Sequence, residues 1–185
     1  AFGGYCDKFV IDQDYAVHVP SNLDLSGVAP LMCAGITLYS PLKNWGAGKG
    51  KKVGIMGLGG LGHMGLKFAH AMGAHVVLFT TSKNKVSDAL RLGADEVCIS
   101  TDEIEIAKYI NQLDFILNTV AAPHKLDLYL QLLKKDGTMA LVGASVRISS
   151  RISCFWLGSR PSVGSSRMSS FGSSRSARPM ASCCC

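Results

Sequence analysis

Residues 53–62 read VGIMGLGGLG, a short apolar run followed by three glycines in the spacing G-x-G-x-x-G. The apolar run predicts a buried strand, and the apolar stripe after it predicts a helix that begins at the glycines. In such a unit Gly57 permits the tight turn, Gly59 lets the backbone approach a pyrophosphate, and Gly62 lets the helix pack against the strand. The free N–H groups of the helix start suit phosphates. The context therefore favours a dinucleotide site over a glycine-rich turn without a ligand.

Short apolar runs alternate with helical patterns in the rest of the chain. Strands are expected at 53–56, 75–79, 96–100, 114–120 and 137–143. Helices are expected at 25–43, 61–72, 86–92, 103–113 and 125–134. This alternation predicts an α/β fold with a parallel sheet and helices on both faces. Ligands bind such sheets at the carboxyl ends of the strands, so the positions to examine are 57–62, 80–85, 119–122 and 143–144.

The residues after the second expected strand indicate which cofactor fits. An NAD site places Asp or Glu about 20 residues beyond the glycines, where the carboxylate accepts hydrogen bonds from the ribose 2′-OH. Here that place holds Thr80, Thr81 and Ser82, followed by Lys83 and Lys85. Hydroxyl and ammonium groups without a carboxylate suit a 2′-phosphate. The sequence therefore predicts NADP(H); the alternative is an ordinary polar loop.

The charge of the chain is unevenly distributed. The whole chain has 19 Lys and Arg against 13 Asp and Glu, a formal net charge of +6. Six of the basic residues, all Arg, lie beyond residue 144, which leaves 13 basic and 13 acidic residues in 1–144. Because residues 1–144 carry no net charge, we predict no nucleic-acid partner. No run of 18 or more apolar residues occurs, so we also predict no membrane span.

The amino terminus and the cysteines give further expectations. The chain begins at Ala1 without a signal-peptide pattern, so we expect a cytoplasmic location and a start inside a longer protein. No CxxC spacing occurs, so neither a disulfide framework nor a structural zinc site is indicated. Residues 9–11 and 16–19 alternate weakly on either side of a turn composition, which predicts two short strands.

Residues 1–144 resemble the zinc-dependent medium-chain alcohol dehydrogenases, in the branch of bacterial NADP-dependent aldehyde reductases related to plant cinnamyl alcohol dehydrogenases. The resemblance is carried by APLMCAGITLYSPLK (29–43), GKKVGIMGLGGLGHMGLKFAHAMGAHVVLFTTS (50–82), LGADEV (92–97), DFILNTVAAPHKLD (114–127) and LLKKDGTMALVGA (132–144). It implies a Rossmann-type parallel sheet with helices on both faces, joined to a GroES-like β catalytic domain.

The resemblance also implies domain boundaries. Residues 1–23 match a remnant of the GroES-like domain, whose first half is absent from this sequence. Residues 24–50 match a connecting helix and loop, and residues 51–144 match an incomplete NADP-binding Rossmann domain. Residues 145–185 form a Ser/Arg-rich tail that departs from the family.

The resemblance assigns roles to matched positions. Cys33 matches the third ligand of the catalytic zinc, although a lone Cys is more often a small buried residue. His63 is expected to be a core or cofactor-rim residue, and His124 a surface loop residue. The positions expected to contact NADP(H) are Thr37, Gly57, Leu58, Gly59, Gly60, Leu61, Thr80, Thr81, Ser82, Lys85, Thr119, Val120 and Ala121.

The family chemistry is hydride transfer between a nicotinamide and an alcohol or aldehyde, with zinc polarising the oxygen. A catalytic zinc needs three protein ligands, and this sequence supplies one. We therefore expect a fragment of an NADP(H)- and zinc-dependent oxidoreductase that acts on a small-molecule aldehyde or alcohol. The fragment is expected to be inactive alone, and the parent enzyme to be a homodimer. The alternative is a non-catalytic nucleotide-binding module with a basic tail that engages a partner.

The tail at 145–185 has no apolar period and is rich in Ser and Arg. We predict that it is disordered and that its reading frame has shifted after Ala144; the alternative is a genuine tail that binds RNA or acidic partners. Without a sixth strand, the sheet edge beside 137–143 is expected to be bare.

Overall fold

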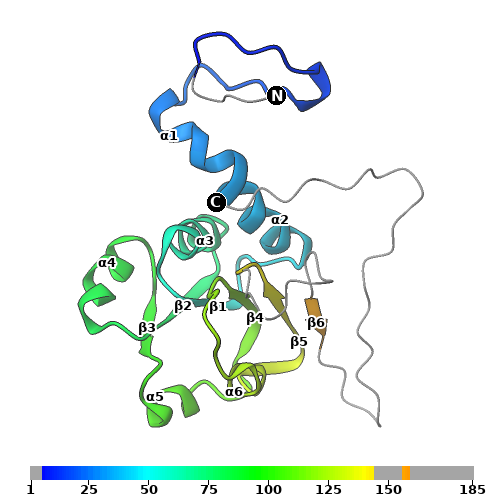
Figure 1. Ribbon diagram of the computed structural model, residues 1–185. Coiled ribbons are helices and arrows are strands. Elements are labelled where there is room, and N and C mark those ends of the chain that lie inside the picture. Colours follow the sequence, from blue (N-terminus) through cyan, green and yellow to red (C-terminus); the bar gives the residue numbers. More distant parts are fainter. Residues whose placement is uncertain (1–5, 144–155, 159–185) are drawn as a thin grey trace.

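The computed structural model describes residues 6–143 and 156–158 of the chain, as a sheet with the strand order β3-β2-β1-β4-β5-β6. The strands are β1 (Lys52–Met56), β2 (His75–Thr80), β3 (Glu96–Ile99), β4 (Leu113–Asn118), β5 (Leu133–Leu141) and β6 (Trp156–Gly158). All pairings among β1 to β5 are parallel (Figure 1). The predicted parallel α/β sheet is confirmed, and the order 3-2-1-4-5 is that of the doubly wound nucleotide-binding fold.

Helices cover both faces of the sheet, as the alternation of elements predicts. They are η1 (Gln13–Tyr15), α1 (Leu25–Pro30), η2 (Leu31–Gly35), α2 (Ile36–Asn44), α3 (Gly60–Ala71), η3 (Lys83–Lys85), α4 (Val86–Arg91), α5 (Glu103–Ala107) and α6 (Leu126–Leu130). The core divides into two clusters because successive strand side chains point to opposite faces. In β2, Val76 and Leu78 join one cluster, with α2, α3 and α4. Val77 and Phe79 join the other, with α5 and α6.

Two helices are shorter than the sequence predicts. The helix expected at 103–113 ends at Ala107, and turns follow in which Asn111 has a positive φ of 57°. The helix expected at 125–134 ends at Leu130, because Leu133 already pairs with Leu113 of β4. The turns after Ala107 therefore end the first helix early, and the pairing of Leu133 with the sheet ends the second.

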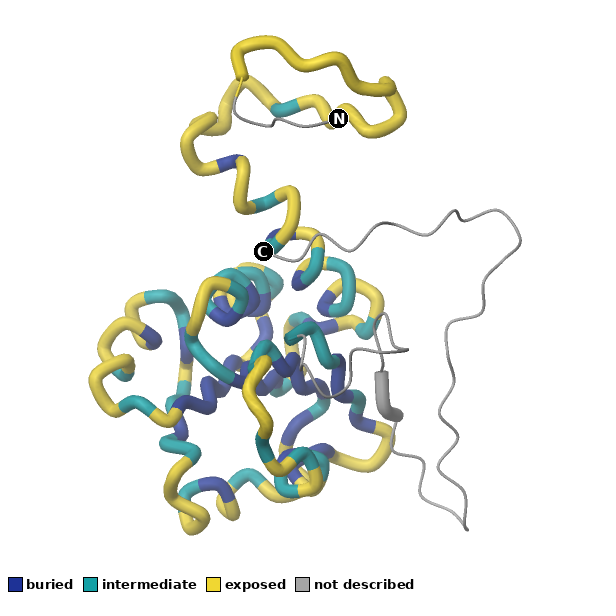
Figure 2. The backbone as a smooth tube through the Cα atoms, in the orientation of Figure 1, coloured by how far each residue is buried: buried dark blue, intermediate teal, exposed yellow. Residues whose placement is uncertain are grey.

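The expected pair of strands near the amino terminus is wrong for the described residues. Residues 6–24 contain a 3-10 turn, η1, in which the Asp12 carboxylate accepts a hydrogen bond from Asp14 N at 3.0 Å. Val10 beside it is 97% exposed. Two strands without a hydrophobic partner layer are marginal in water, and this segment lies apart from the sheet (Figures 1 and 2).

The segments α1, η2 and α2 follow one another as a helical run from Leu25 to Asn44. By length and composition alone this run is sufficient to cross a membrane, but the core helix of a soluble protein meets the same test. The absence of a membrane partner therefore stays a prediction.

The expectation of a bare sheet edge is wrong at β6. This strand pairs antiparallel with β5, with Gly158 opposite Thr138 and Trp156 opposite Ala140. Such pairing uses backbone groups that an edge strand would otherwise leave open. The predictions that the tail is disordered and frame-shifted concern, apart from β6, residues 144–155 and 159–185, which lie outside the described residues.

Candidate functional site

The glycine turn joins the end of β1 to the start of α3. Gly57 has a φ of 85°, a conformation that favours glycine, and its N–H donates to the Phe79 carbonyl at 2.8 Å. A Cβ on Gly62 would clash with the carbonyl oxygen of Gly57, whereas a Cβ on Gly59 or Gly60 would meet nothing within 4 Å. The turn is thus closed where the helix packs on it and open where backbone N–H groups can meet a ligand.

Thr119 ties the end of β4 to this turn. Its N–H and its hydroxyl both donate to the Met56 carbonyl, at 3.2 and 2.6 Å. The next residue, Val120, reaches to 3.0 Å from the position of a Cβ on Gly57. Besides the cofactor contact predicted for Thr119, its side chain therefore has a structural role in supporting the turn.

The segment after β2 approaches the same turn. Thr80 is 5% exposed, and its hydroxyl accepts a hydrogen bond from Ser82 N at 3.2 Å. The Lys85 ammonium donates to the Leu58 carbonyl at 3.1 Å. Lys85 therefore brings a positive charge to the space between the glycine turn and the end of β2.

A pocket of about 680 Å³ lies at the carboxyl ends of β1, β2, β3 and β4. Its lining includes every residue predicted to contact NADP(H) except Thr37 and Ala121, and no carboxylate lines it among the described residues. Ala122 lies within the strand-end positions 119–122 named from the sequence, whereas sequence reasoning missed Met56, Phe79, Ser100, Pro123, His124 and Tyr129. Ser100 directly follows β3, so the rule that ligands bind at the carboxyl ends of strands was sufficient to identify it.

His124 lies in the loop between β4 and α6, as the sequence predicts, but its side chain contacts other parts of the site. It is half-buried, its Nε2 lies 2.8 Å from Asn118 Nδ2, and its Nδ1 lies 2.7 Å from the Ala122 carbonyl oxygen. Its ring also contacts Tyr129 edge to face, with centroids 6.0 Å apart. A contact that joins a strand end to the loop beyond it has no local sequence signal. His63 is half-buried on α3 and does not line the pocket.

Cys33 and Thr37 lie on the helical run rather than in the pocket. Cys33 is exposed, contrary to the expectation for a lone cysteine, and Thr37 is half-buried. No group of three or more His, Cys, Asp or Glu side chains that suits a metal occurs among residues 6–143. The described residues therefore do not fit a catalytic zinc, which needs three protein ligands.

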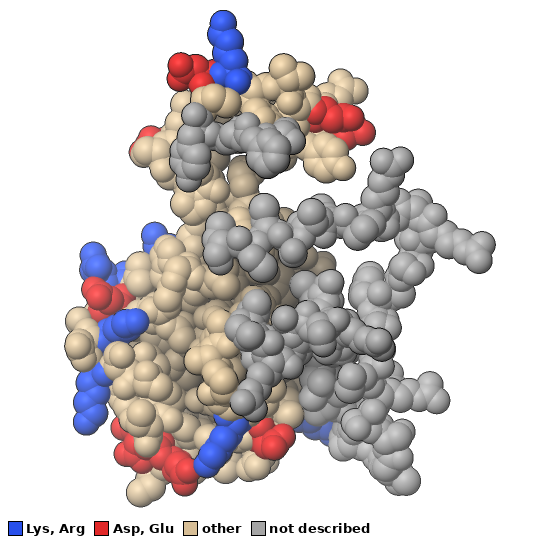
Figure 3. Space-filling model, viewed as in Figure 1, with Lys and Arg blue, Asp and Glu red and all other residues tan. Residues whose placement is uncertain are grey.

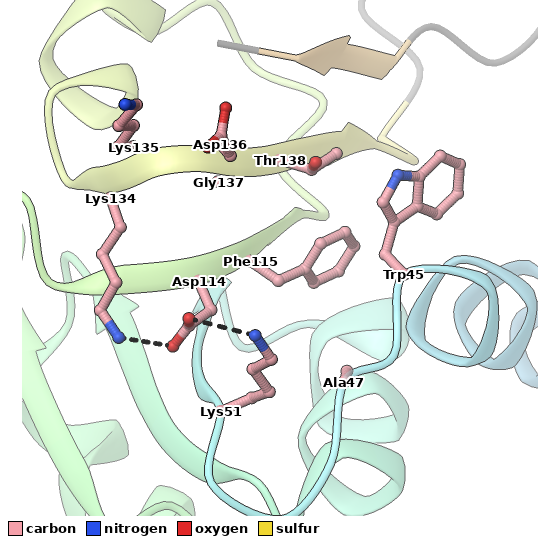
Figure 4. A pocket seen from close by; sticks show the side chains of 10 residues that line it. All are labelled: Trp45, Ala47, Lys51, Asp114, Phe115, Lys134, Lys135, Asp136, Gly137 and Thr138. Atoms are coloured by element: carbon pink, nitrogen blue, oxygen red, sulfur yellow. Dashed lines mark hydrogen bonds and ion pairs between the residues drawn. The ribbon is translucent and has the colours of Figure 1, made fainter. Parts of the chain in front are cut away.

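A smaller hollow of about 200 Å³ lies at the opposite ends of the strands, beside the amino ends of β1 and β4 (Figure 4). Three of its charged side chains contact one another: Asp114 lies 3.5 Å from the Lys51 ammonium and 2.8 Å from that of Lys134. Desolvation raises the pKa of Asp114, but hydrogen bonds from Lys134 and Lys52 N outweigh it and lower the pKa. This cluster joins the starts of β1, β4 and β5.

Charged side chains of both signs are interspersed on the face drawn in Figure 3. On that face the described residues form no continuous basic surface, in keeping with the balanced charge of residues 1–144. The absence of a nucleic-acid partner stays a prediction.

Comparison with known proteins identifies relatives of this chain. The family described as zinc-binding dehydrogenase matches residues 60–181. Aldehyde reductase YahK of Escherichia coli is 59% identical over 143 residues, which cover 77% of this chain and 41% of that protein. NADP-dependent alcohol dehydrogenase C 1 of Mycolicibacterium smegmatis is 48% identical over 141 residues, which cover 76% and 40%. The chain thus spans about two fifths of the length of these relatives.

Solved structures show the same relationship. A cinnamyl alcohol dehydrogenase from Sorghum bicolor, SbCAD4, matches with a TM-score of 0.71 and 45% identity, over 73% of this chain and 39% of that chain. The structure of CAD from Helicobacter pylori complexed with NADP(H) matches with a TM-score of 0.67 and 44% identity, over 73% and 38%.

Proposed function

This chain belongs to the zinc-binding dehydrogenase family, and on that premise we propose that it is the NADP(H)-binding part of an oxidoreductase that interconverts alcohols and aldehydes. One observation carries the proposal. A single pocket combines an open glycine turn at a helix start with hydroxyl groups and a lysine, and its described lining contains no carboxylate.

Each part of the pocket has a distinct task in this proposal. The backbone N–H groups near Gly59 and Gly60, at the start of α3, bind the pyrophosphate. Thr81, Ser82 and the Lys85 ammonium bind the 2′-phosphate, since charge-assisted hydrogen bonds favour an anion there. When bound, NADPH supplies the hydride for the reaction.

The floor of the pocket is apolar and excludes water from the nucleoside. Phe79 and Tyr129 both line the pocket, and their rings meet edge to face with centroids 6.1 Å apart. Both side chains belong to one buried core cluster, so this part of the pocket is formed by the fold itself. A preformed site reduces the entropic cost of binding.

For the longer protein we propose a small-molecule alcohol or aldehyde as substrate, a cytoplasmic location and homodimeric assembly, with no nucleic acid or membrane as partner. The names of the aldehyde reductase and alcohol dehydrogenase relatives support the substrate class. Cys33 is proposed as a zinc ligand only in that longer protein, where the remaining ligands would come from other segments. The chain described here is proposed to lack catalytic activity by itself.

Cofactor choice tests the proposal. Titration of the chain with NADPH and NADH, followed by cofactor fluorescence, should show tighter binding of NADPH. One charge-assisted hydrogen bond contributes about 1.5–3 kcal/mol, which is roughly a 10- to 150-fold preference. Thr80→Asp places a carboxylate at the end of β2 and should reverse the preference, whereas the control Thr80→Ser should keep it. Equal affinity of the unmodified chain for the two cofactors would refute the proposal.

A further inference from the structure

We infer that His124 is a positioning residue that holds one wall of the dinucleotide pocket through a neutral imidazole with both ring nitrogens engaged. The inference rests on the proposed function only for its consequence on cofactor binding. Its geometry stands on residues 118–124, the segment that runs from the end of β4 past the pocket.

The hydrogen bonds of Asn118 fix the orientation of its side chain. Asn118 is the last residue of β4 and is 1% exposed. Its Oδ1 accepts a hydrogen bond from Val120 N at 3.0 Å, so the other end of the amide, Nδ2, faces His124 Nε2 at 2.8 Å. An amide nitrogen only donates, and therefore Nε2 of His124 is the acceptor.

The second ring nitrogen completes the assignment. Nδ1 of His124 lies 2.7 Å from the carbonyl oxygen of Ala122, and a carbonyl oxygen only accepts. The proton therefore resides on Nδ1, and the imidazole is neutral. A proton on Nε2 would oppose the Nδ2 donor of Asn118, so the alternative tautomer and the imidazolium both break this contact.

Asn118 links this contact to the rest of the site. Its backbone carbonyl accepts hydrogen bonds from Val142 N at 2.9 Å and Gly143 N at 3.2 Å, beyond the end of β5. The segment that leaves Asn118 is anchored at its start by Thr119 on Met56 O, and it returns to Asn118 through His124.

The closed segment forms a wall of the pocket. Thr119, Val120, Ala122, Pro123 and His124 all line the cavity. Fixing both ends of the segment preorganises this wall, which favours binding because less freedom is lost when a ligand arrives. Loss of His124 should therefore weaken NADPH binding without unfolding the sheet.

The test uses the full chain with His124→Ala and His124→Gln, since a glutamine carbonyl can replace Nε2 as the acceptor from Asn118. His63→Ala, a half-buried histidine on α3 outside the pocket lining, is the matched control. In the ligand-free unmodified chain, ¹⁵N chemical shifts should show a neutral His124 protonated on Nδ1. Amide exchange at Val120 should accelerate in His124→Ala and be restored in His124→Gln.

Binding gives the second readout. NADPH affinity should fall roughly two- to tenfold in His124→Ala, the size expected for one neutral hydrogen bond, and remain unchanged in His63→Ala. If the unmodified chain does not bind NADPH, the proposed function fails, but the ligand-free NMR and exchange data still decide the role of His124. A proton on Nε2, or unchanged Val120 exchange in His124→Ala, would overturn the inference.

Discussion

Valine behaves in opposite ways in two regions of this molecule. In the amino-terminal arm, residues 6–24, Val10 and Val17 are 97% and 68% exposed. In β2, Val76 and Val77 are fully buried. β2 buries its valines because helices cover each face of the sheet, whereas the arm extends from the sheet and its helices without a covering layer (Figure 2). Alternating apolar residues form a stable strand only where further strands or a helix pack against their apolar face.

The largest expected difference between the two regions is in side-chain truncation. Leu117 of β4 is fully buried, and Leu117→Ala should lower the free energy of unfolding by about 2–5 kcal/mol. Leu23→Ala makes the same chemical change at an arm residue that is 42% exposed, and should change the free energy of unfolding by less than about 0.5 kcal/mol. Urea titration of both variants measures this. Similar losses would mean that the arm is as well packed as the sheet.

Two glycines of α3 sharpen the comparison within the body. A Cβ on Gly62 would clash with the Gly57 carbonyl oxygen, whereas a Cβ on Gly60 would meet open space. Gly62→Ala should therefore cost about 1–3 kcal/mol of stability because the turn must shift. Gly60→Ala should be neutral or stabilising by up to about 1 kcal/mol, since alanine favours helix. Thermal unfolding of the two variants measures this difference in stability. Equal melting temperatures for Gly62→Ala and Gly60→Ala would contradict the turn geometry.

Acid should weaken the body through Glu96, which accepts hydrogen bonds from His75, Lys52 and Tyr109. Desolvation raises the pKa of Glu96, but these contacts outweigh it and lower the pKa from 4.5 to about 2. The stabilisation is therefore complete above about pH 4.5 and is lost as the pH falls towards about 2.

Replacement of this carboxylate tests the assignment. Glu96→Gln should make the free energy of unfolding less dependent on pH between about 4.5 and 2. Glu103→Gln, at an exposed position on α5, is the control and should leave the pH dependence of the unmodified chain intact. Identical pH profiles for Glu96→Gln and the unmodified chain would contradict the role given to the cluster.

Zinc should have the smallest effect, because the helical run offers Cys33 and no further ligands close enough to form a site among the described residues. Added zinc should neither raise the melting temperature nor produce aldehyde reduction with NADPH, and Cys33→Ser should behave as the unmodified chain does. Zinc-dependent turnover that Cys33→Ser abolishes would show that the chain assembles a working metal site.

The two regions also differ in how far the sequence predicts them. The parallel direction of β1 to β5 follows from local patterns, because buried strands and amphipathic helices alternate in 53–141, whereas the order of the strands in the sheet was not predicted. The strands expected at 9–11 and 16–19 are absent. The local pattern does not indicate whether another layer of the protein covers these residues, and the prediction failed for that reason. β6 forms by pairing with β5, and no local pattern in the Ser/Arg-rich segment predicts that pairing.

The candidate site divides in the same way. Gly57 and Lys85 are found from a motif and a spacing, because the strand ends bring those positions together in any sheet of this kind. His124 and Tyr129 are not, because their place depends on how the loop after β4 closes and on α6 beginning at Leu126.

Amide hydrogen exchange across the whole chain, with and without NADPH, tests the central claim most directly: the sheet is a self-sufficient dinucleotide-binding unit, and the arm is not. The account predicts strong protection in β1, β2 and β4, exchange near the unfolded rate in 6–24, and added protection on NADPH binding confined to the pocket segments, chiefly 57–61 and 80–85. Protection of the arm equal to that of the sheet, or no change in the glycine turn with saturating NADPH, would contradict it.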